Sequence, residues 1–226
     1  MVVAAAGSSS RMGGEDKLLA DLGGMPVLMR TLLAVDTAES VDEIVVAARE
    51  DRLPVVADIC ARAGIRKPVK VIRGGETRTD SVLAAAMECD PKTELIAVHD
   101  GARPLILPEE IDALVRLAGK TYATAPAVPV SDTVKVADEN GLVRETPDRK
   151  TLYAVQTPQI FQADILKAAL QSARNSGLPI TDDCSAVERI GKEVYLTEGN
   201  PENIKITTPV DLAVAEAILR RRESKL

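Results

Sequence analysis

Aromatic side chains are scarce in this sequence, since its 226 residues include one Phe, three Tyr and no Trp. Surfaces that bind single-stranded nucleic acid stack successive bases on aromatic rings, and four rings are too few for one. The formal net charge of −6 likewise argues against a nucleic acid or an anionic membrane as partner. A local basic pocket for a phosphorylated small molecule is still compatible with that average. We therefore expect an aliphatic core and a small-molecule ligand.

Cysteine and histidine are also few: the chain has Cys60, Cys89, Cys184 and His99. The cysteines are far apart, form no CxxC pair and have one imidazole as a possible co-ligand. This pattern supports neither a disulfide scaffold nor a zinc site. We expect reduced, structural thiols and a cytoplasmic location.

Long apolar runs are absent, because no run approaches the ~18 residues that cross a bilayer. The opening MVVAAAGSSSRM has no basic region ahead of its short apolar stretch, so we expect no signal peptide. With 46% hydrophobic residues, the chain has enough apolar material for a globular core. Its length predicts a single domain, residues 1–226, that carries one excursion.

Short apolar runs alternate with helical patterns along most of the chain. This rhythm is typical of βα units on a largely parallel sheet, and it predicts an α/β fold. Several helices begin at recognisable signals, such as Pro26, Pro108, Pro209 and a cap at Thr79. The predicted strands are residues 2–5, 43–47, 69–72, 95–99, 124–129 and 194–197.

One segment breaks this rhythm. Residues 131–149 read SDTVKVADENGLVRETPDR, two alternating runs around Asn140-Gly141, and Asn-Gly is a strong hairpin turn signal. A two-stranded hairpin is marginal alone in water. We therefore expect it to pack on another surface, of which a second copy of the chain is the simplest.

Ligands of open α/β sheets bind where the strands end, and two of the predicted strands end in glycine-rich loops. After the first strand, GSSSRMGGEDK offers backbone amides and hydroxyls for phosphate oxygens, with Arg11 and Lys17 as countercharges. It satisfies neither the Walker pattern nor GxGxxG, and a mobile polar loop is the alternative. After the third strand, RGGETRTDSV enters a helix whose N-terminal amides suit an anion or a base edge, although a simple glycine turn is also compatible.

The fourth strand ends in VHDGARP, which places Asp100 and Arg103 at the same edge. A carboxylate beside a phosphate-binding loop is typical of a magnesium site, and a local ion pair is the alternative. His99 is not expected to act as a base, because alternation along a strand points it away from Asp100. Cys184 has no catalytic partner nearby and is interpreted as a packing thiol.

Nine motifs, taken in order, resemble the 2-C-methyl-D-erythritol 4-phosphate cytidylyltransferases over essentially the whole chain. They are AAAGSSSRM, Lys17, GGETRTDSV, VHDGARP, PVSDTVK, TPDR, TPQIF, ITDDCSAVE and NIKIT. The resemblance implies a Rossmann-like, mostly parallel sheet sandwiched by helices, from which a β-hairpin arm protrudes. It also implies a homodimer, with residues 131–152 as the dimerisation arm.

The resemblance further implies roles for matching positions. Cytosine would be read by Ala5, Ala6, Gly7, Gly75 and Ser81. The triphosphate would be gripped by Arg11, Lys17 and Lys205, and magnesium would be held by Asp100. The methylerythritol phosphate pocket would be formed by Asp100, Arg103, Thr133 and Thr181, with Arg149 and Thr157 reaching across the dimer.

Three departures from the family pattern stand out. The family usually has Pro where Ala4 stands, Pro-Lys-Gln where Asp16-Lys17-Leu18 stands, and often Ala where Gly101 stands. Asp16 places a negative charge next to the predicted triphosphate lysine. We therefore expect the loop geometry around Lys17 to differ from the family pattern.

The reaction implied is transfer of CMP from CTP to 2-C-methyl-D-erythritol 4-phosphate, with release of pyrophosphate, in isoprenoid precursor synthesis. A ribitol 5-phosphate cytidylyltransferase is the nearest alternative, and PVSDTVK, TPDR and TDDCSAVE favour methylerythritol. A catalytically dead nucleotide-binding regulator would have lost its phosphate or metal residues. A purely structural dimerisation protein would need no phosphate cradle.

Overall fold

Near-continuous aliphatic runs form the centre of one sheet in the computed structural model, which describes residues 1–7, 16–177 and 180–224. Within those residues the strand order is β10-β5-β9-β4-β1-β2-β3, with β8 paired to β5. The sheet strands are β1 (Val2–Ala5), β2 (Ile44–Ala48), β3 (Val69–Arg73), β4 (Leu95–Asp100), β5 (Ala123–Pro129), β8 (Tyr153–Val155), β9 (Gln159–Gln162) and β10 (Tyr195–Glu198).

The sheet is mostly parallel, as the sequence predicts. Strands β1, β2, β3 and β4 form parallel pairs, and β10 pairs parallel with β5. The exceptions are β8 and β9, which run antiparallel to their neighbours. All six predicted strands are found within one residue of their expected bounds, and β8 and β9 are additional.

Helices cover both faces of the sheet, because alternate strand residues point to opposite sides. Val3 and Val46 pack in one aliphatic core under α1, α2, α4 and α7, whereas Val2 and Val45 pack in a second core under α3, α5 and α6. None of the helices in the described part of the chain combines the length and apolar character of a membrane span. The helices are α1 (Val27–Thr37), α2 (Leu53–Arg62), α3 (Arg78–Met87), α4 (Pro108–Thr121), α5 (Ala163–Ser176), α6 (Asp183–Arg189) and α7 (Pro209–Glu223), with short 3₁₀ turns η1 (Glu50–Arg52) and η2 (Arg149–Thr151).

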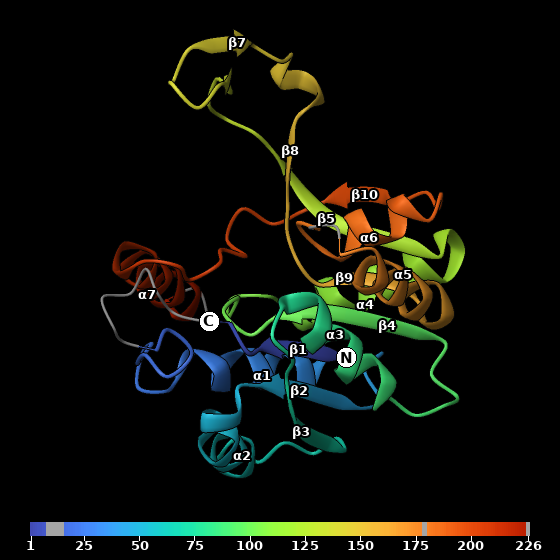
Figure 1. Cartoon of the computed structure of the whole chain (residues 1–226). Coiled ribbons are helices and arrows are strands. Elements are labelled where there is room, and N and C mark those ends of the chain that lie inside the picture. The colour runs from blue at the N-terminus through green and yellow to red at the C-terminus, as the bar shows by residue number, and fades with distance from the viewer. Residues whose placement is uncertain (8–15, 178–179, 225–226) are drawn as a thin grey trace.

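The predicted hairpin is present and projects from the body of the molecule (Figure 1). Its strands β6 (Val136–Ala137) and β7 (Val143–Glu145) pair antiparallel around a turn in which Gly141 has φ +81°. Asp138 closes the turn by accepting hydrogen bonds from the backbone of Asn140 and Leu142 at 3.0 Å. The hairpin therefore forms where Asn-Gly predicts it, and it lies apart from both cores.

Apolar side chains on this projection are exposed. Val136, Leu142 and Val143 on the hairpin are 45–58% exposed, and Tyr153 on β8 is 49% exposed. A two-stranded hairpin buries too little apolar surface to be stable by itself. This surface is available for a partner.

Candidate active site

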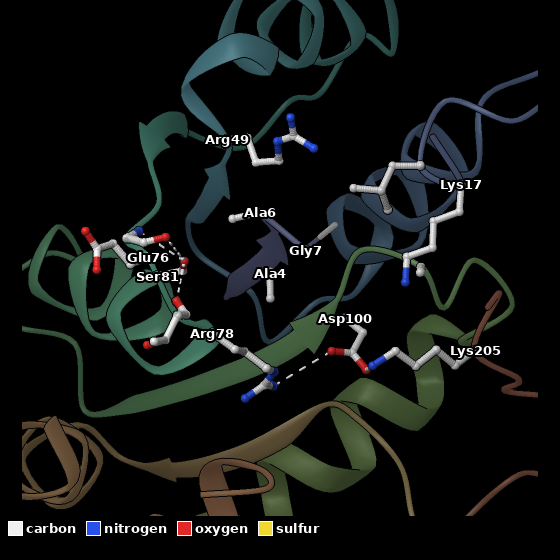
Figure 2. A pocket seen from close by; sticks show the side chains of 14 residues that line it. Ala4, Ala6, Gly7, Lys17, Arg49, Glu76, Arg78, Ser81, Asp100 and Lys205 are labelled. Atoms are coloured by element: carbon white, nitrogen blue, oxygen red, sulfur yellow. Dashed lines mark hydrogen bonds and ion pairs between the residues drawn. The ribbon is translucent and has the colours of Figure 1, made fainter. Parts of the chain in front are cut away.

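A cavity of about 410 Å³ lies where β1, β2, β3 and β4 end (Figure 2). β1 lies between two parallel neighbours, β2 on one side and β4 on the other. The next strand in the chain, β2, therefore lies on the opposite side of β1 from β4. Such a reversal of strand order opens a crevice at the carboxyl edge of an α/β sheet. The segments that follow these strands therefore supply the cavity walls.

Small residues form the wall beneath α3. Ala6, Gly7, Gly75 and Ser81 all line the cavity, as the resemblance implies for cytosine contacts. Ala5 does not line it, because its side chain packs into the core below α1. Of the five predicted base contacts, the cavity therefore brings together four.

Ser81 fixes the glycine turn that precedes α3. Its Oγ accepts a hydrogen bond from the Gly75 N–H at 3.1 Å and donates to the Thr77 carbonyl at 2.8 Å. A Cβ on Gly74 would lie 2.7 Å from the Ala6 Cβ, and one on Gly75 would lie 2.3 Å from the Asp80 Cβ. The two glycines are thus required for close packing, which leaves Gly75 at the cavity surface.

The N-terminus of α3 opens onto the same cavity. Thr77 caps the helix, its Oγ1 accepting from the Asp80 N–H at 3.0 Å, while the Asp80 carboxylate accepts from the Thr77 N–H at 3.2 Å. The helix therefore begins at Arg78 and not after Thr79 as the sequence predicted.

Asp100 is the centre of a charged cluster on the opposite wall (Figure 2). Its carboxylate lies 2.8 Å from Lys205 Nζ, 3.5 Å from Arg103 Nε and 3.8 Å from Arg78 Nη2. Burial raises its pKa, but Lys205 and Arg78 outweigh burial and hold the pKa at about 2. Asp100 is therefore ionised at neutral pH, and the Asp100–Arg103 ion pair that the sequence left open is also present.

Several residues of this site were not recognised from the sequence, among them Arg49 on the cavity wall. Arg78 lies in GGETRTDSV, for which the sequence predicted a binding role of the backbone amides only, and Asp183 lies in ITDDCSAVE. Arg78 Nη2 lies 2.8 Å from the wholly buried Asp183 Oδ2. Burial raises the pKa of Asp183, and the Arg78 guanidinium opposes this. Arg78 thus links α6 to Asp100 across the cavity floor.

Lys17 lines the cavity from the turn that precedes α1. The neighbouring Asp16 does not line it, since Asp16 Oδ1 accepts from the Leu18 N–H at 3.1 Å and Oδ2 lies 3.4 Å from Arg52 Nε. Asp16 therefore closes the turn, and the nearby Arg52 offsets its charge. Arg11, the other predicted triphosphate residue of this loop, lies outside the described residues.

The predicted acceptor-side residues are spread more widely. Arg103 is buried beside Asp100, and its Nη1 donates to the Asn203 carbonyl at 2.7 Å. Thr133 and Arg149 lie on the projecting segment, where Arg149 Nη1 donates to the Ser131 carbonyl at 2.6 Å. Thr181 is exposed just before α6. The cavity of a single chain does not include Thr133, Arg149 or Thr181.

Thr157 and His99 are buried in the interior of the protein. Thr157 is 4% exposed, and its Oγ1 lies 3.0 Å from both the Asp100 N and His99 Nδ1. His99 is wholly buried, does not line the cavity, and has its pKa lowered by burial to about 4. His99 is consequently neutral and has no access to a ligand, in agreement with the expectation that it is not the base.

All three cysteines are buried, free thiols. Burial raises the pKa of Cys184, and the nearby Asp182 and Asp183 raise it further. A nucleophilic cysteine needs a lowered pKa and access to its substrate. Cys184 therefore packs α6, as the sequence predicted.

Magnesium is the one metal that the site could suit. Across residues 1–7, 16–177 and 180–224, no three Asp, Glu, His or Cys side chains form a metal-binding group. Magnesium needs no such group when substrate phosphates supply oxygens, since one or two carboxylates then suffice. Asp100 is an ionised carboxylate on the cavity wall, so the donor set fits magnesium together with a polyphosphate.

The fold and cavity define an α/β protein with a charged binding site at the carboxyl edge of its sheet, and comparison with known proteins gives its family. The model of the 2-C-methyl-D-erythritol 4-phosphate cytidylyltransferase family matches residues 1–221, so the chain belongs to that family. The enzyme of that name from Pelotomaculum thermopropionicum is 45% identical over 100% of this chain and 95% of its own length. That of Caldanaerobacter subterraneus is 41% identical over 97% of this chain and 98% of its own.

Solved structures agree with this assignment. The 4-diphosphocytidyl-2C-methyl-D-erythritol synthase of Anaerococcus prevotii superposes with a TM-score of 0.86 at 31% identity, covering 97% of this chain and 96% of that one. The 2-C-methyl-D-erythritol 4-phosphate cytidylyltransferase of Thermus thermophilus gives a TM-score of 0.77 at 31% identity, with 97% and 98% covered. The α/β fold expected from the sequence is thus confirmed.

Proposed function

We propose that this protein transfers CMP from CTP to 2-C-methyl-D-erythritol 4-phosphate, giving 4-diphosphocytidyl-2-C-methyl-D-erythritol and pyrophosphate for isoprenoid synthesis. The observation that carries the proposal is full-length membership of the family together with a cavity in which Lys205 and Arg78 flank the ionised carboxylate of Asp100. Lys17, Arg49, Arg78 and Lys205 line that cavity. They suit a ligand with several phosphates.

The reaction is an in-line displacement at the α-phosphorus of CTP. A phosphate oxygen of the acceptor forms the new P–O bond, and the bond between the α-phosphorus and the bridging oxygen breaks, so its electron pair leaves with pyrophosphate. The second pKa of a phosphate monoester is about 6, so the nucleophile is mostly ionised at pH 7. No general base is needed, which agrees with the buried, neutral His99. Catalysis then depends on positioning and charge neutralisation.

Lys17, Lys205 and Arg11 are assigned to the triphosphate. Lys17 and Lys205 approach the cavity from opposite ends of the chain, and Figure 2 shows both ammonium groups directed toward the Asp100 side. Developing charge at the α-phosphate is best stabilised by donors already in place before reaction. On the other wall, Ala6, Gly7, Gly75 and Ser81 are assigned to the base, with the backbone of Ala5.

Asp100 is assigned to magnesium, which when bound would supply charge neutralisation and orientation to the triphosphate. The ammonium of Lys205 lies 2.8 Å from Asp100 Oδ2 and lowers the pKa of Asp100, so this carboxylate is ionised before any ligand binds. The ammonium can then donate to a phosphate oxygen, while the carboxylate would hold the magnesium. Arg103, beside them, is assigned to the acceptor phosphate.

Isotope labelling tests the direction of attack. With ¹⁸O in the phosphate of 2-C-methyl-D-erythritol 4-phosphate, the proposal predicts that the label stays in the diphosphate product and that released pyrophosphate carries none. Mass spectrometry of both products measures this. Label in pyrophosphate would contradict attack by the acceptor phosphate.

A homodimer is the second part of the proposal. The projecting segment 131–152 exposes Val136, Leu142 and Val143 and carries Thr133 and Arg149, which lie away from the cavity of their own chain. A second copy that packs against this arm would cover the apolar surface and receive the two polar side chains. A cytoplasmic location accords with the three free thiols.

Replacing Val143 by Asp tests the arm. A charge in a covered apolar surface is costly, so we expect the variant to dissociate to monomers at concentrations where the parent is dimeric, with lower turnover. Light scattering after gel filtration measures mass, and Val210→Asp, on an exposed valine of α7, is the matched control. A monomeric, fully active parent would refute the arm's role.

A further inference from the structure

A buried chain of hydrogen bonds lies behind Asp100. The Asp100 N–H donates to Thr157 Oγ1 at 3.0 Å, Thr157 Oγ1 lies 3.0 Å from His99 Nδ1, and His99 Nε2 lies 3.2 Å from the Arg103 carbonyl. The carbonyl can only accept, so Nε2 carries the imidazole proton. In a neutral ring Nδ1 then accepts, and the Thr157 hydroxyl donates to it. The Thr157 proton is thereby fully committed inside the protein.

A second path joins the same threonine to the segment that carries Lys205. Asn203 Nδ2 donates to the Thr157 carbonyl at 2.9 Å, and the Asn203 carbonyl accepts from Arg103 Nη1 at 2.7 Å. Asn203 is 1% exposed. Thr157 therefore joins three segments by hydrogen bonds: its own β8–β9 connection, the end of β4 and the segment before α7.

We infer that His99 and Thr157 are positioning residues that act together: their hydrogen bond fixes the Asp100–Arg103 turn. The inference rests on the proposed role of Asp100. It is separate from the substrate contact that the family resemblance implies for Thr157. The imidazole and the hydroxyl form one unit because each supplies the partner that the other needs.

The physical basis is the cost of unpaired buried groups. Removing the Thr157 hydroxyl leaves the Asp100 N–H and His99 Nδ1 without partners in a region sealed from water. Removing the acceptor at Nδ1 frees the hydroxyl to turn. In both cases the turn relaxes and the Asp100 carboxylate shifts relative to Lys205. A shift of this kind lowers turnover, and in the His99 variant it does so without removing a group that lines the cavity.

Four variants test this: Thr157→Val, Thr157→Ser, His99→Gln and His99→Asn. Valine removes the hydroxyl at constant shape and serine restores it. Asparagine can place an acceptor where Nδ1 lies, whereas glutamine reaches the Nε2 position and leaves Thr157 without its acceptor. We expect Thr157→Val and His99→Gln each to lower kcat about tenfold, with Thr157→Ser and His99→Asn close to the parent.

The double variant Thr157→Val/His99→Gln provides the decisive comparison. If the two residues act as one unit, its kcat is no lower than that of the worse single variant. The half-saturating magnesium concentration rises in both single variants, and KM for 2-C-methyl-D-erythritol 4-phosphate changes little. Additive losses, or a Thr157→Val effect confined to that KM while His99→Gln has none, would overturn the inference.

Thr124→Val is the matched control. Thr124 is also fully buried, and its Oγ1 donates to the Tyr195 carbonyl at 2.9 Å between β5 and β10. It should lower the melting temperature as Thr157→Val does, yet leave kcat and the magnesium dependence unchanged. If Asp100→Asn is inert, the proposed role of Asp100 fails; if it is inactive while Thr157→Val and His99→Gln match the parent, the inference alone fails.

Discussion

Lys17→Ala is expected to lower turnover by roughly 10²–10³-fold, the loss that follows removal of one preorganised donor to a developing charge. Lys17 lines the cavity, and the turn that presents it is closed by Asp16, whose carboxylate is engaged by the Leu18 N–H and by Arg52. The ammonium thus reaches the cavity from a fixed backbone. Binding of CTP should weaken less than turnover falls, because other cations line the same cavity.

Steady-state pyrophosphate release measures the effect, with kcat and the KM for CTP determined separately. Lys120→Ala, on the exposed end of α4, removes the same charge outside the cavity and should leave both constants unchanged. Near-normal turnover of Lys17→Ala would show that Lys17 does not act on the triphosphate.

Asp100→Asn is expected to have a similarly large effect, roughly 10²–10³-fold on turnover, for a different reason. The substitution keeps the shape of the side chain and removes the negative charge that pairs with Lys205 and that we propose holds magnesium. Raising the magnesium concentration should recover little of the loss. Asp164→Asn, an exposed position at the start of α5, is the control and should behave as the parent.

Asp100→Asn should also change the free energy of unfolding and its dependence on pH. The Asp100 pKa of about 2 lies below the ordinary value of 3.8, so the ionised carboxylate stabilises the fold fully above pH ~4. That contribution is lost as the pH falls through about 2. Chemical denaturation should therefore show Asp100→Asn less stable than the parent by about 2 kcal/mol at pH 7. The difference should shrink as the pH is lowered from 4, and a difference independent of pH would contradict the ion-pair account.

The sheet was predictable from local pattern because its central strands are buried on both faces. Strands such as β1 and β2 are near-continuous aliphatic runs, which the sequence shows directly. β9 was missed because Gln159 and Gln162 bound only two apolar residues, Ile160 and Phe161. Gln159 can be buried there because its Oε1 accepts hydrogen bonds from the Asp183 and Cys184 N–H groups, each at 3.1 Å. That long-range contact has no local signal.

Site residues in the loops that follow strands could be predicted from the sequence. Site residues that depend on contacts between distant elements could not. Lys17, Gly75, Asp100 and Lys205 line one cavity, as the loop positions and family motifs imply. Arg78 could have been suspected from its place at a helix start, but its pairing with Asp183 joins α3 to α6. Spacing along the chain does not contain that information.

Thr157 illustrates the same limit. Its motif, TPQIF, identifies a position that matters to the family, but sequence alone does not say whether its hydroxyl faces a substrate or the protein. In the structure the hydroxyl is satisfied by Asp100 and His99. The importance of a position and the way it acts are therefore separate questions, and the second depends on geometry.

Magnesium-dependent pyrophosphate release from CTP is the most direct test of the central claim. It compares 2-C-methyl-D-erythritol 4-phosphate with ribitol 5-phosphate as acceptors, each also with ATP, GTP and UTP. The account predicts release that requires CTP, magnesium and the methylerythritol acceptor. Preference for ribitol 5-phosphate, or no release with any pair, would contradict it.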